Sequence, residues 1–331
     1  MRSDIFFLVW LIVGAVVFAA AATLGNDYYF FAGYVVLQYV VLSTAWNILG
    51  GYCGYVNFGS AAFFALGAYS TVAIHRFDPM PIPVLVAVGG LVSGIVGLAM
   101  GYLTLRLRGA FFAIATLALA VVLQTLVVNW DYVGGSRGAY IVRPEAIAPF
   151  GSYIRYLFFV MTLLAIGAIT VARMIERSRL GYGFATIRDD ELAAEASGVP
   201  TLRLKLIATT ISGAIMGMAG APFPYYIGFL QPSSAFSLDY AVNSIAMPLI
   251  GGTTSWAGPL VGALLLGSLQ QVATETISSA VNLLIVGLLL VGFVIVAPNG
   301  IIGLVRKYIQ HKPLGQIGQR RVDAGATGAS P

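Results

Sequence analysis

Few residues in this sequence have the chemistry for catalysis or metal binding, and they do not form a set. The 331 residues include one cysteine, Cys53, and two histidines, His75 and His311, which lie far apart in the chain. A zinc site needs three or four such ligands, and a disulfide needs two cysteines. We therefore expect no metal on this chain, and we interpret Cys53 and His75 as packing or interfacial residues.

The densest run of ionisable residues lies between 176 and 203, in the segment ERSRLGYGFATIRDDELAAEASGVPTLR. The pattern predicts one helix that begins near Ser178 and a second at about 187–197, with acidic residues in its first turn, where the helix dipole favours them. Gly198 and Pro200 predict the end of the second helix. Residues three and four apart share a helix face, so this helix has a small apolar face of Leu192, Ala193 and Ala196.

This apolar face is too small to bury itself in a domain of its own. It has the character of a surface that docks in a groove of a partner protein. A solvated connecting loop with no partner is the alternative that composition alone leaves open.

A second group of polar residues lies beside glycine-rich breaks in two apolar stretches. Glycine lets the backbone break and approach its neighbours closely, and the breaks are at Gly50, Gly51, Gly54, Gly251, Gly252 and Gly258. The polar residues next to them are candidates for lining a solute pathway: Asn47, Tyr52, Asn57, Ser60, Thr253, Thr254 and Ser255. Free backbone groups and half-helix ends of this kind can hold the charged groups of a zwitterion. Helix packing through small residues is the alternative interpretation.

The elements that hold these residues are apolar, because hydrophobic residues make up 59% of the chain and charged residues only 9%. A soluble domain is about one quarter charged, so the composition excludes a cytosolic globular enzyme, a disordered protein and a disulfide scaffold. The net charge of +5 fits basic cytoplasmic loops of a membrane protein better than nucleic-acid binding. The predicted fold class is an all-α polytopic membrane protein in the lipid bilayer.

A span needs about 20 mostly apolar residues, and the sequence predicts eight: 5–24, 29–49, 59–75, 82–104, 109–130, 153–175, 204–229 and 280–302. The broken stretch 241–274 is interpreted as two half-length helices that enter the membrane and return on the same side. Counting them as full spans gives ten helices. Cytoplasmic N- and C-termini place 14 of the 18 Lys and Arg residues inside, as the positive-inside rule requires.

The centres of the eight predicted spans contain no Asp, Glu, Lys, Arg or His. A charge in mid-membrane usually marks an ion or proton path, so a proton-coupled carrier or a membrane-embedded enzyme is disfavoured. A stand-alone secondary carrier that binds sodium through backbone carbonyls stays open. The predicted domains are a membrane domain, 1–305, and a cytoplasmic tail, 306–331, which is first basic and then disordered.

The loop at 176–203 resembles the "EAA" cytoplasmic loop of bacterial ABC-importer permeases, and more closely that of the branched-chain amino acid permeases of the LivM type. The matching residues are Ser178, Leu180, Gly181, Ala185, Ile187, Arg188, Glu191, Ala193, Ala194, Glu195 and Gly198. Further stretches are similar to the same family in the same order: 47–69, 105–120, 134–138, 204–221, 249–266 and 297–305. The resemblance therefore covers the chain from about 45 to 310.

The resemblance implies a permease subunit of an ABC importer in the bacterial inner membrane, which moves branched-chain amino acids or a related small polar solute. It also implies three kinds of partner: a related LivH-type permease, two cytoplasmic ATPases that hold ATP and magnesium, and a periplasmic substrate-binding protein. This chain would then be no enzyme and carry no cofactor. The sequence agrees, since it contains no GxxxxGK[ST] phosphate-binding loop.

The resemblance further implies that residues 187–198 form a coupling helix in a cleft of one ATPase. Leu192, Ala193 and Ala196 would supply its buried face. Polar contacts at the rim of the cleft would come from Arg188, Asp189, Asp190, Glu191 and Glu195.

Overall fold

The computed structural model describes residues 3–23, 26–143, 147, 150–276 and 300–304, and positions 284, 287, 288, 291 and 292. Most of the predicted span at 280–302 and the predicted tail at 306–331 lie outside the described residues. Everything below concerns the described part of the chain.

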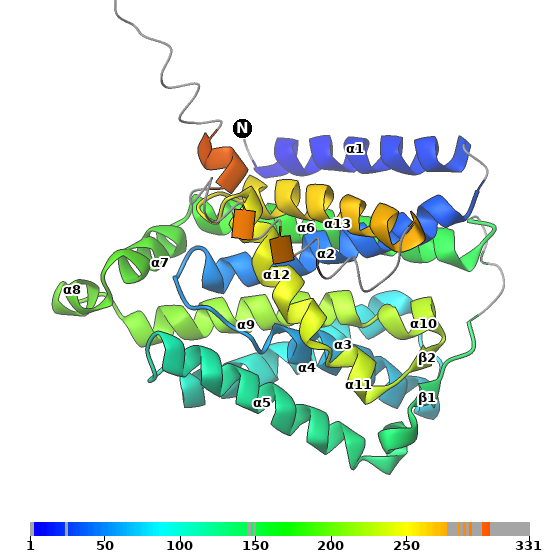
Figure 1. Ribbon diagram of the computed structural model, residues 1–331, viewed down its shortest axis with the longest axis horizontal. Coiled ribbons are helices and arrows are strands. Elements are labelled where there is room, and N and C mark those ends of the chain that lie inside the picture. Colours follow the sequence, from blue (N-terminus) through cyan, green and yellow to red (C-terminus); the bar gives the residue numbers. More distant parts are fainter. Residues whose placement is uncertain are drawn as a thin grey trace, which may run out of the picture.

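The described chain is a bundle of long helices (Figure 1). Five of them are long and apolar enough to cross a membrane, which supports the all-α polytopic membrane class. The long helices are α1 (Ser3–Thr23), α2 (Tyr28–Gly50), α3 (Ser60–Phe77), α4 (Ile82–Thr104), α5 (Ala110–Val128), α6 (Tyr153–Glu176), α9 (Thr201–Gly220), α12 (Leu238–Gly251) and α13 (Ala257–Thr276). Seven predicted spans coincide with these helices within a few residues, the seventh combining α9 with a short continuation, α10 (Phe223–Ile227).

The two ends of the bundle differ. The short helices α7 (Arg179–Asp189) and α8 (Glu191–Ala196) project from one end, called the α8 end below (Figure 1). At the other end, called the β1 end, the 3-10 turns η1 (Asp131–Val133) and η2 (Gly135–Arg137) precede β1 (Ala139–Tyr140), and α11 (Pro232–Ala235) follows β2 (Phe229–Leu230). The two strands pair antiparallel, with Ala139 opposite Leu230.

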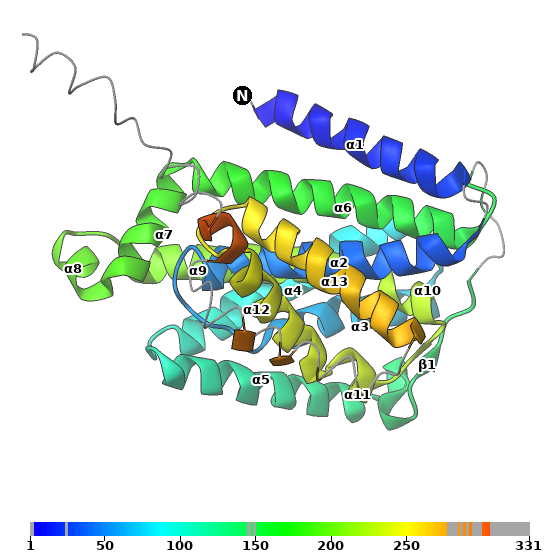
Figure 2. The ribbon, with the colours of Figure 1, turned by 45° about the horizontal axis from the view of Figure 1, so that its top comes forward.

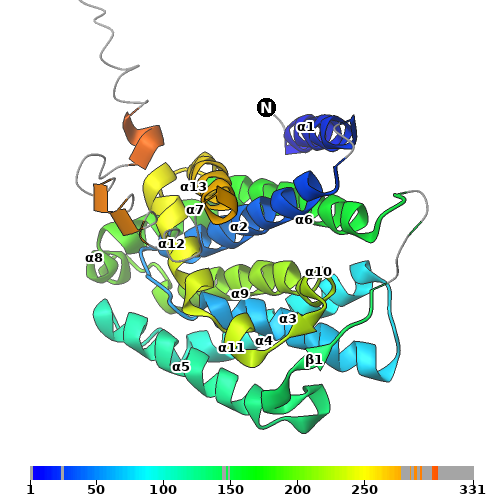
Figure 3. The same cartoon turned by 45° about the vertical axis from the view of Figure 1, so that its right-hand side comes forward.

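Helix α2 lies in the middle of the bundle and packs against α6, α9, α12 and α13. Helix α1 lies on the outside of the bundle and packs along α6, as the two rotated views show (Figures 2 and 3). Glycines bring α3, α4 and α9 unusually close, since a Cβ on Gly217 would meet the Ser93 side chain and the Gly89 carbonyl, and one on Gly220 would meet the Phe64 carbonyl. Small residues are the usual means of such close packing in membranes.

The broken stretch consists of α12 and α13, joined by a turn at Gly252–Trp256. The turn was predicted correctly, but the half-length assignment is wrong for α13, whose 20 residues span about 30 Å. The turn lies level with the last residues of α2 and α6, because Asn47 donates to the Thr253 carbonyl at 3.0 Å and the Trp256 N–H donates to the Glu176 carboxylate at 2.6 Å. The two helices therefore form a hairpin whose turn is at the α8 end.

Candidate functional site

The two helices of the loop at 176–203 each begin at a side-chain cap. The Ser178 hydroxyl accepts the N–H groups of Leu180 and Gly181 at 3.2 and 3.4 Å, and the Asp190 carboxylate accepts the Ala193 N–H at 3.0 Å. Side-chain oxygens at this position satisfy N–H groups that have no partner inside the helix.

The cap at Asp190 corrects the predicted start of the second helix. Asp190 is extended, with φ of −160°, so α8 begins at Glu191 and not at 187. Arg188 and Asp189 consequently belong to the end of α7. The reason is local: an aspartate that caps the following helix interrupts the preceding one, because its side chain competes for the backbone N–H groups.

The structure explains why glycine occupies two positions of the loop, 198 and 181. Gly198 adopts φ of +82°, a left-handed conformation that favours glycine, and it follows the end of α8 as predicted. Gly181 packs α7 onto the end of α6, since a Cβ there would meet the carbonyls of Ile175 and Glu176.

Helix α8 presents one face to the outside and one to the bundle. The side chain of Leu192 is 64% exposed, and Ala193 and Ala196 are exposed as well. Ala194, on the opposite face, is buried. The small apolar face predicted from the sequence is therefore open in this chain.

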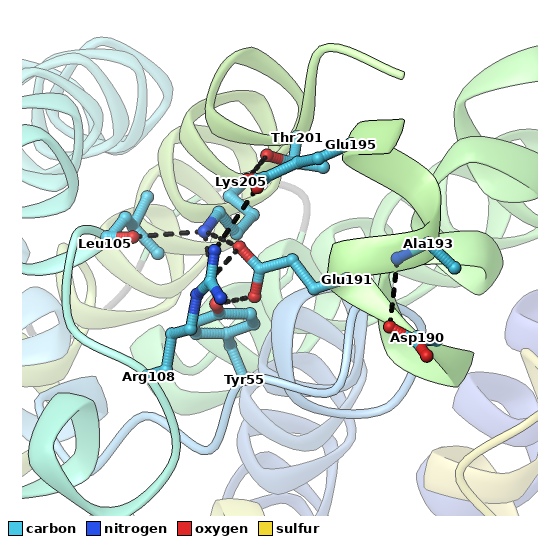
Figure 4. A network of polar contacts seen from close by, with 9 residues as sticks. All are labelled: Tyr55, Leu105, Arg108, Asp190, Glu191, Ala193, Glu195, Thr201 and Lys205. Carbon is cyan, nitrogen blue, oxygen red and sulfur yellow. Dashed lines mark hydrogen bonds and ion pairs between the residues drawn. The ribbon is translucent and has the colours of Figure 1, made fainter. Parts of the chain in front are cut away.

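Glu191 turns inward and forms the centre of a polar cluster (Figure 4). Its carboxylate lies 2.7 Å from the Lys205 ammonium and 3.6 Å from Arg108 Nε, and it accepts a hydrogen bond from the Tyr55 hydroxyl. The Lys205 side chain is 4% exposed and that of Glu191 13%. We call Tyr55, Arg108, Glu191 and Lys205 the α8 anchor.

The α8 anchor joins four separate segments of the chain. Lys205 lies on α9 and also donates to the Leu105 carbonyl at 3.0 Å and to the Tyr55 hydroxyl at 3.1 Å. Tyr55 belongs to the α2–α3 connection, and Leu105 belongs to the α4–α5 connection. A displacement of α8 would therefore act on all these segments together.

Glu195 adds a second attachment one turn along α8. Its carboxylate lies 3.3 Å from Arg108 Nη2 and accepts a hydrogen bond from the Thr201 hydroxyl at 2.8 Å. Glu191 and Glu195 thus both bond to residues outside α8 within the same chain. Asp189, by contrast, is exposed and pairs with the neighbouring Arg188. The docking role of the loop itself stays a prediction.

Burial and hydrogen bonding act in opposite directions on Glu191. Burial raises its pKa, but hydrogen bonds from Lys205 and Tyr55 and the charges of Lys205 and Arg108 outweigh burial, so the pKa lies below its usual value. Burial and the bond to Glu191 raise the pKa of Tyr55. At neutral pH the carboxylate is therefore charged and the phenol is a donor.

We expect the contribution of Glu191 to stability to depend on pH in a defined direction. Because its pKa is lowered in the folded chain, the contribution is complete above the unfolded-chain pKa of about 4.3. It declines as the pH falls below that value and is lost below the folded pKa. Unfolding midpoints of the wild type and of Glu191→Gln, measured in detergent from pH 7 to pH 3, should differ at pH 7, and the difference should narrow as the pH falls below about 4.3. A difference that is constant over this range would contradict the ion pair.

The predicted pathway residues Asn47, Tyr52 and Thr253 meet at the α8 end. Besides the Asn47–Thr253 bond, the Tyr52 hydroxyl donates to Glu176 at 3.4 Å. Ser255 is buried in the same turn, and Thr254 is exposed. The side chains of Asn47 and Glu176 fasten the α12–α13 turn to α2 and α6 through its backbone.

Asn57 and Ser60 lie deeper in the bundle. The backbone before α3 is non-helical, and its Phe58 N–H donates to the Thr116 hydroxyl at 3.2 Å, about 9 Å inside α5. The Asn57 side chain accepts the Gly59 N–H at 2.7 Å, and the Ser60 hydroxyl lies 3.4 Å from that of Ser244 on α12. Irregular backbone at this depth is tolerated where protein surrounds it, and both residues are buried.

The six glycines predicted as backbone breaks divide into two kinds. Gly54 and Gly252 adopt φ of +80° and +118° and are true breaks. Gly50, Gly51, Gly251 and Gly258 do not have positive φ, and Gly258 lies in the first turn of α13, so the prediction of a break is wrong for it. Its physical role is close approach, because a Cβ on Gly258 would meet the Gly252 carbonyl.

Sequence reasoning missed Tyr55, Arg108 and Lys205 as partners of Glu191. They come from separate segments, with no common spacing, and the one available signal was a lysine at the start of an apolar helix. Cys53 is buried, and burial raises its pKa to about 12, which fits its interpretation as a packing residue. Among the described residues, no three His, Cys, Asp or Glu side chains are grouped as metal ligands.

Comparison of the sequence with known proteins identifies the family to which this chain is similar. Residues 28–294 match the family model described as branched-chain amino acid transport system / permease component. The chain is 27% identical to the high-affinity branched-chain amino acid transport system permease protein LivM of Salmonella typhimurium, over 83% of this chain and 70% of that protein. It is 26% identical to the LivM protein of Escherichia coli, with the same coverage. It is also 25% identical to a probable LivH permease of Methanocaldococcus jannaschii, over 75% and 83% of the two chains. No solved structure matches.

Proposed function

This chain belongs to the family of permease components of branched-chain amino acid transport systems and is a permease subunit of an ABC importer, and from that premise we propose that ATPases on partner chains drive it through α8. Two such ATPases would hold ATP and magnesium, and this chain would move the solute. The solute would be a branched-chain amino acid or a related small polar molecule, since the relatives' names specify branched-chain amino acids.

The proposed orientation places the α8 end and both termini in the cytoplasm of a bacterial inner membrane. Its support is the distribution of positive charge among the described residues. At the α8 end these are Arg106, Arg108, Arg173, Arg177, Arg179, Arg188, Arg203 and Lys205, and at the β1 end Arg76, Arg137, Arg143 and Arg155. A periplasmic binding protein would then deliver the solute to the β1 end, and a LivH-type permease would be the second membrane subunit. With the α12–α13 hairpin counted as two crossings, the full span count of this proposal is ten.

One observation carries the proposal: α8 exposes an apolar face while its other face is held by ion pairs. A six-residue helix gains nothing from an exposed Leu192 unless another surface covers it. The α8 anchor meanwhile attaches the helix to α9 and to the α2–α3 and α4–α5 connections. A partner that moves α8 would consequently move the ends of several membrane helices.

We expect Leu192→Arg to abolish binding of the ATPases and ATP-driven uptake, with little effect on stability. Leu192 is 64% exposed, so the arginine faces water in the isolated chain but would face the apolar cleft of the partner. The measurement is co-purification of the ATPases and solute uptake by the whole complex in liposomes. Leu192→Met is the matched control and should behave as the wild type.

The same reasoning makes Glu195→Arg a less specific test of docking. That change would also remove contacts with Arg108 and Thr201 within this chain. Normal ATPase binding by Leu192→Arg would contradict docking through this face, and uptake by the wild-type complex without ATP would favour a stand-alone secondary carrier.

A further inference from the structure

Helix α2 carries four buried polar side-chain atoms that have no hydrogen-bond partner among the residues that the structure describes, and two of the four lie in its half nearer the β1 end. These two are the hydroxyl oxygen of Tyr34 and the side-chain carbonyl oxygen of Gln38. Tyr34 is 0% exposed and Gln38 2%. The two residues are four apart and so share one face of α2, about 9 and 15 Å from its start at the β1 end.

Such atoms are costly inside a membrane protein. No water is present in the hydrocarbon region to replace the missing bond, and buried polar groups are otherwise nearly always paired. A face that served packing alone would be equally well filled by phenylalanine and methionine. The two polar atoms therefore need an explanation other than packing.

Aromatic rings from three other elements surround this face. The ring of Tyr226 on α10 stacks on Tyr34, with centroids 4.4 Å apart and planes 9° from parallel. The Gln38 amide contacts the hydroxyl of Tyr240 on α12. Phe64 of α3 lies 4.6 Å from the Tyr240 ring, measured between centroids.

Phe223 of α10 is the fourth aromatic ring of this group, with its centroid 5.0 Å from that of Phe64. One part of this group belongs to an element at the β1 end, since α10 has five residues and is followed by Gly228 at φ +77° and then by β2. Pro222 separates α10 from α9, so this short element can move without bending the long helix. In this structure the two polar atoms are buried.

We propose that Tyr34 and Gln38 form a transient binding site for an amino-acid zwitterion with an apolar side chain. The Gln38 carbonyl accepts a hydrogen bond from the ammonium group, and the Tyr34 hydroxyl donates one to the carboxylate. The ring faces attract the ammonium charge and cover the apolar side chain. This site rests on the proposed function, since it lies on the route of the transported solute.

The test uses Tyr34→Phe and Gln38→Met in the complete complex with its second permease, ATPases and binding protein. The probe is radiolabelled leucine, and its ATP-driven uptake into liposomes should fall at least tenfold in each variant. The unfolding midpoint of Tyr34→Phe in detergent should stay equal or rise, because this change removes only an unpaired buried hydroxyl. Gln38→Met is judged by uptake alone, since it also removes the amide that contacts the Tyr240 hydroxyl. Tyr153→Phe is the control: Tyr153 is a buried tyrosine on α6 that packs against Tyr225, and its replacement should leave uptake unchanged.

Each result bears on one claim. Wild-type uptake rates in both variants would overturn the site. A fall in the uptake of Tyr34→Phe accompanied by a lower unfolding midpoint would also overturn it, since that outcome is expected of a packing residue. Uptake by the wild-type complex that needs no ATP would instead contradict the proposed function, and this is measured before any variant is compared.

Discussion

Replacing Glu191 with leucine should destabilise the chain by about 3–5 kcal/mol, the usual cost of removing one partner of a buried ion pair. The Lys205 ammonium would keep only neutral partners, the Leu105 carbonyl and the Tyr55 hydroxyl, at a site where its side chain is 4% exposed. Helix α8 would also lose its main attachment to α9. ATP-driven uptake should therefore be lost together with stability.

The measurement is denaturant unfolding in detergent micelles, with uptake by the assembled complex alongside. The matched control is Asp189→Asn, which removes the carboxylate of the neighbouring Arg188–Asp189 pair. That carboxylate side chain is 71% exposed, and pairs of this kind contribute about 0–1 kcal/mol. The double variant Glu191→Leu/Lys205→Met should recover much of the lost stability, because no unpaired charge remains buried. Equal stability of Glu191→Leu and the wild type would show that the α8 anchor does not hold the helix.

Replacing Gly262 with alanine should have the second large effect. Gly262 lies within α13, and a Cβ there would overlap the carbonyl of Met247 on α12. Since that atom is backbone, it cannot rotate away as a side chain would, and the α12–α13 hairpin must open. We expect a loss of about 3 kcal/mol, at the upper end of what overpacking usually costs.

The comparison is with Gly167→Ala in α6, another glycine within a long helix. A Cβ at Gly167 would meet nothing within 4 Å, so this variant should be neutral or up to about 1 kcal/mol more stable, as alanine is the better helix former. Both variants are measured by unfolding midpoint and by the fraction that remains monodisperse in detergent. Similar behaviour of the two would mean that the hairpin tolerates a wider separation.

The two effects come from different physics and mark different parts of the molecule. The Gly262 effect is steric and belongs to the membrane-embedded packing of α12 on α13. The Glu191 effect is electrostatic and belongs to the attachment of the loop helices. Variants that separate these effects would separate folding of the bundle from transmission through α8.

The sequence by itself determined the membrane class and most boundaries of the long helices. Helix α4 occupies the predicted residues 82–104, and α6 ends one residue from its prediction. This succeeded because a bilayer imposes a minimum length of apolar residues on each crossing, a constraint that is local in the chain. The apolar face of Leu192, Ala193 and Ala196 was predictable for the same reason, since helical spacing is also local.

Only the tertiary structure decided which loop residues face inward. Glu191 and Leu192 are neighbours in the sequence, yet one is bound to Lys205 and Tyr55 and the other is exposed. Tyr55 and Lys205 are 150 positions apart, and no periodicity relates them. Likewise, the unpaired atoms of Tyr34 and Gln38 became visible only once the rings of α3, α10 and α12 were placed around them. Contacts between distant segments depend on how whole helices pack, which is a property of the fold and not of any stretch of sequence.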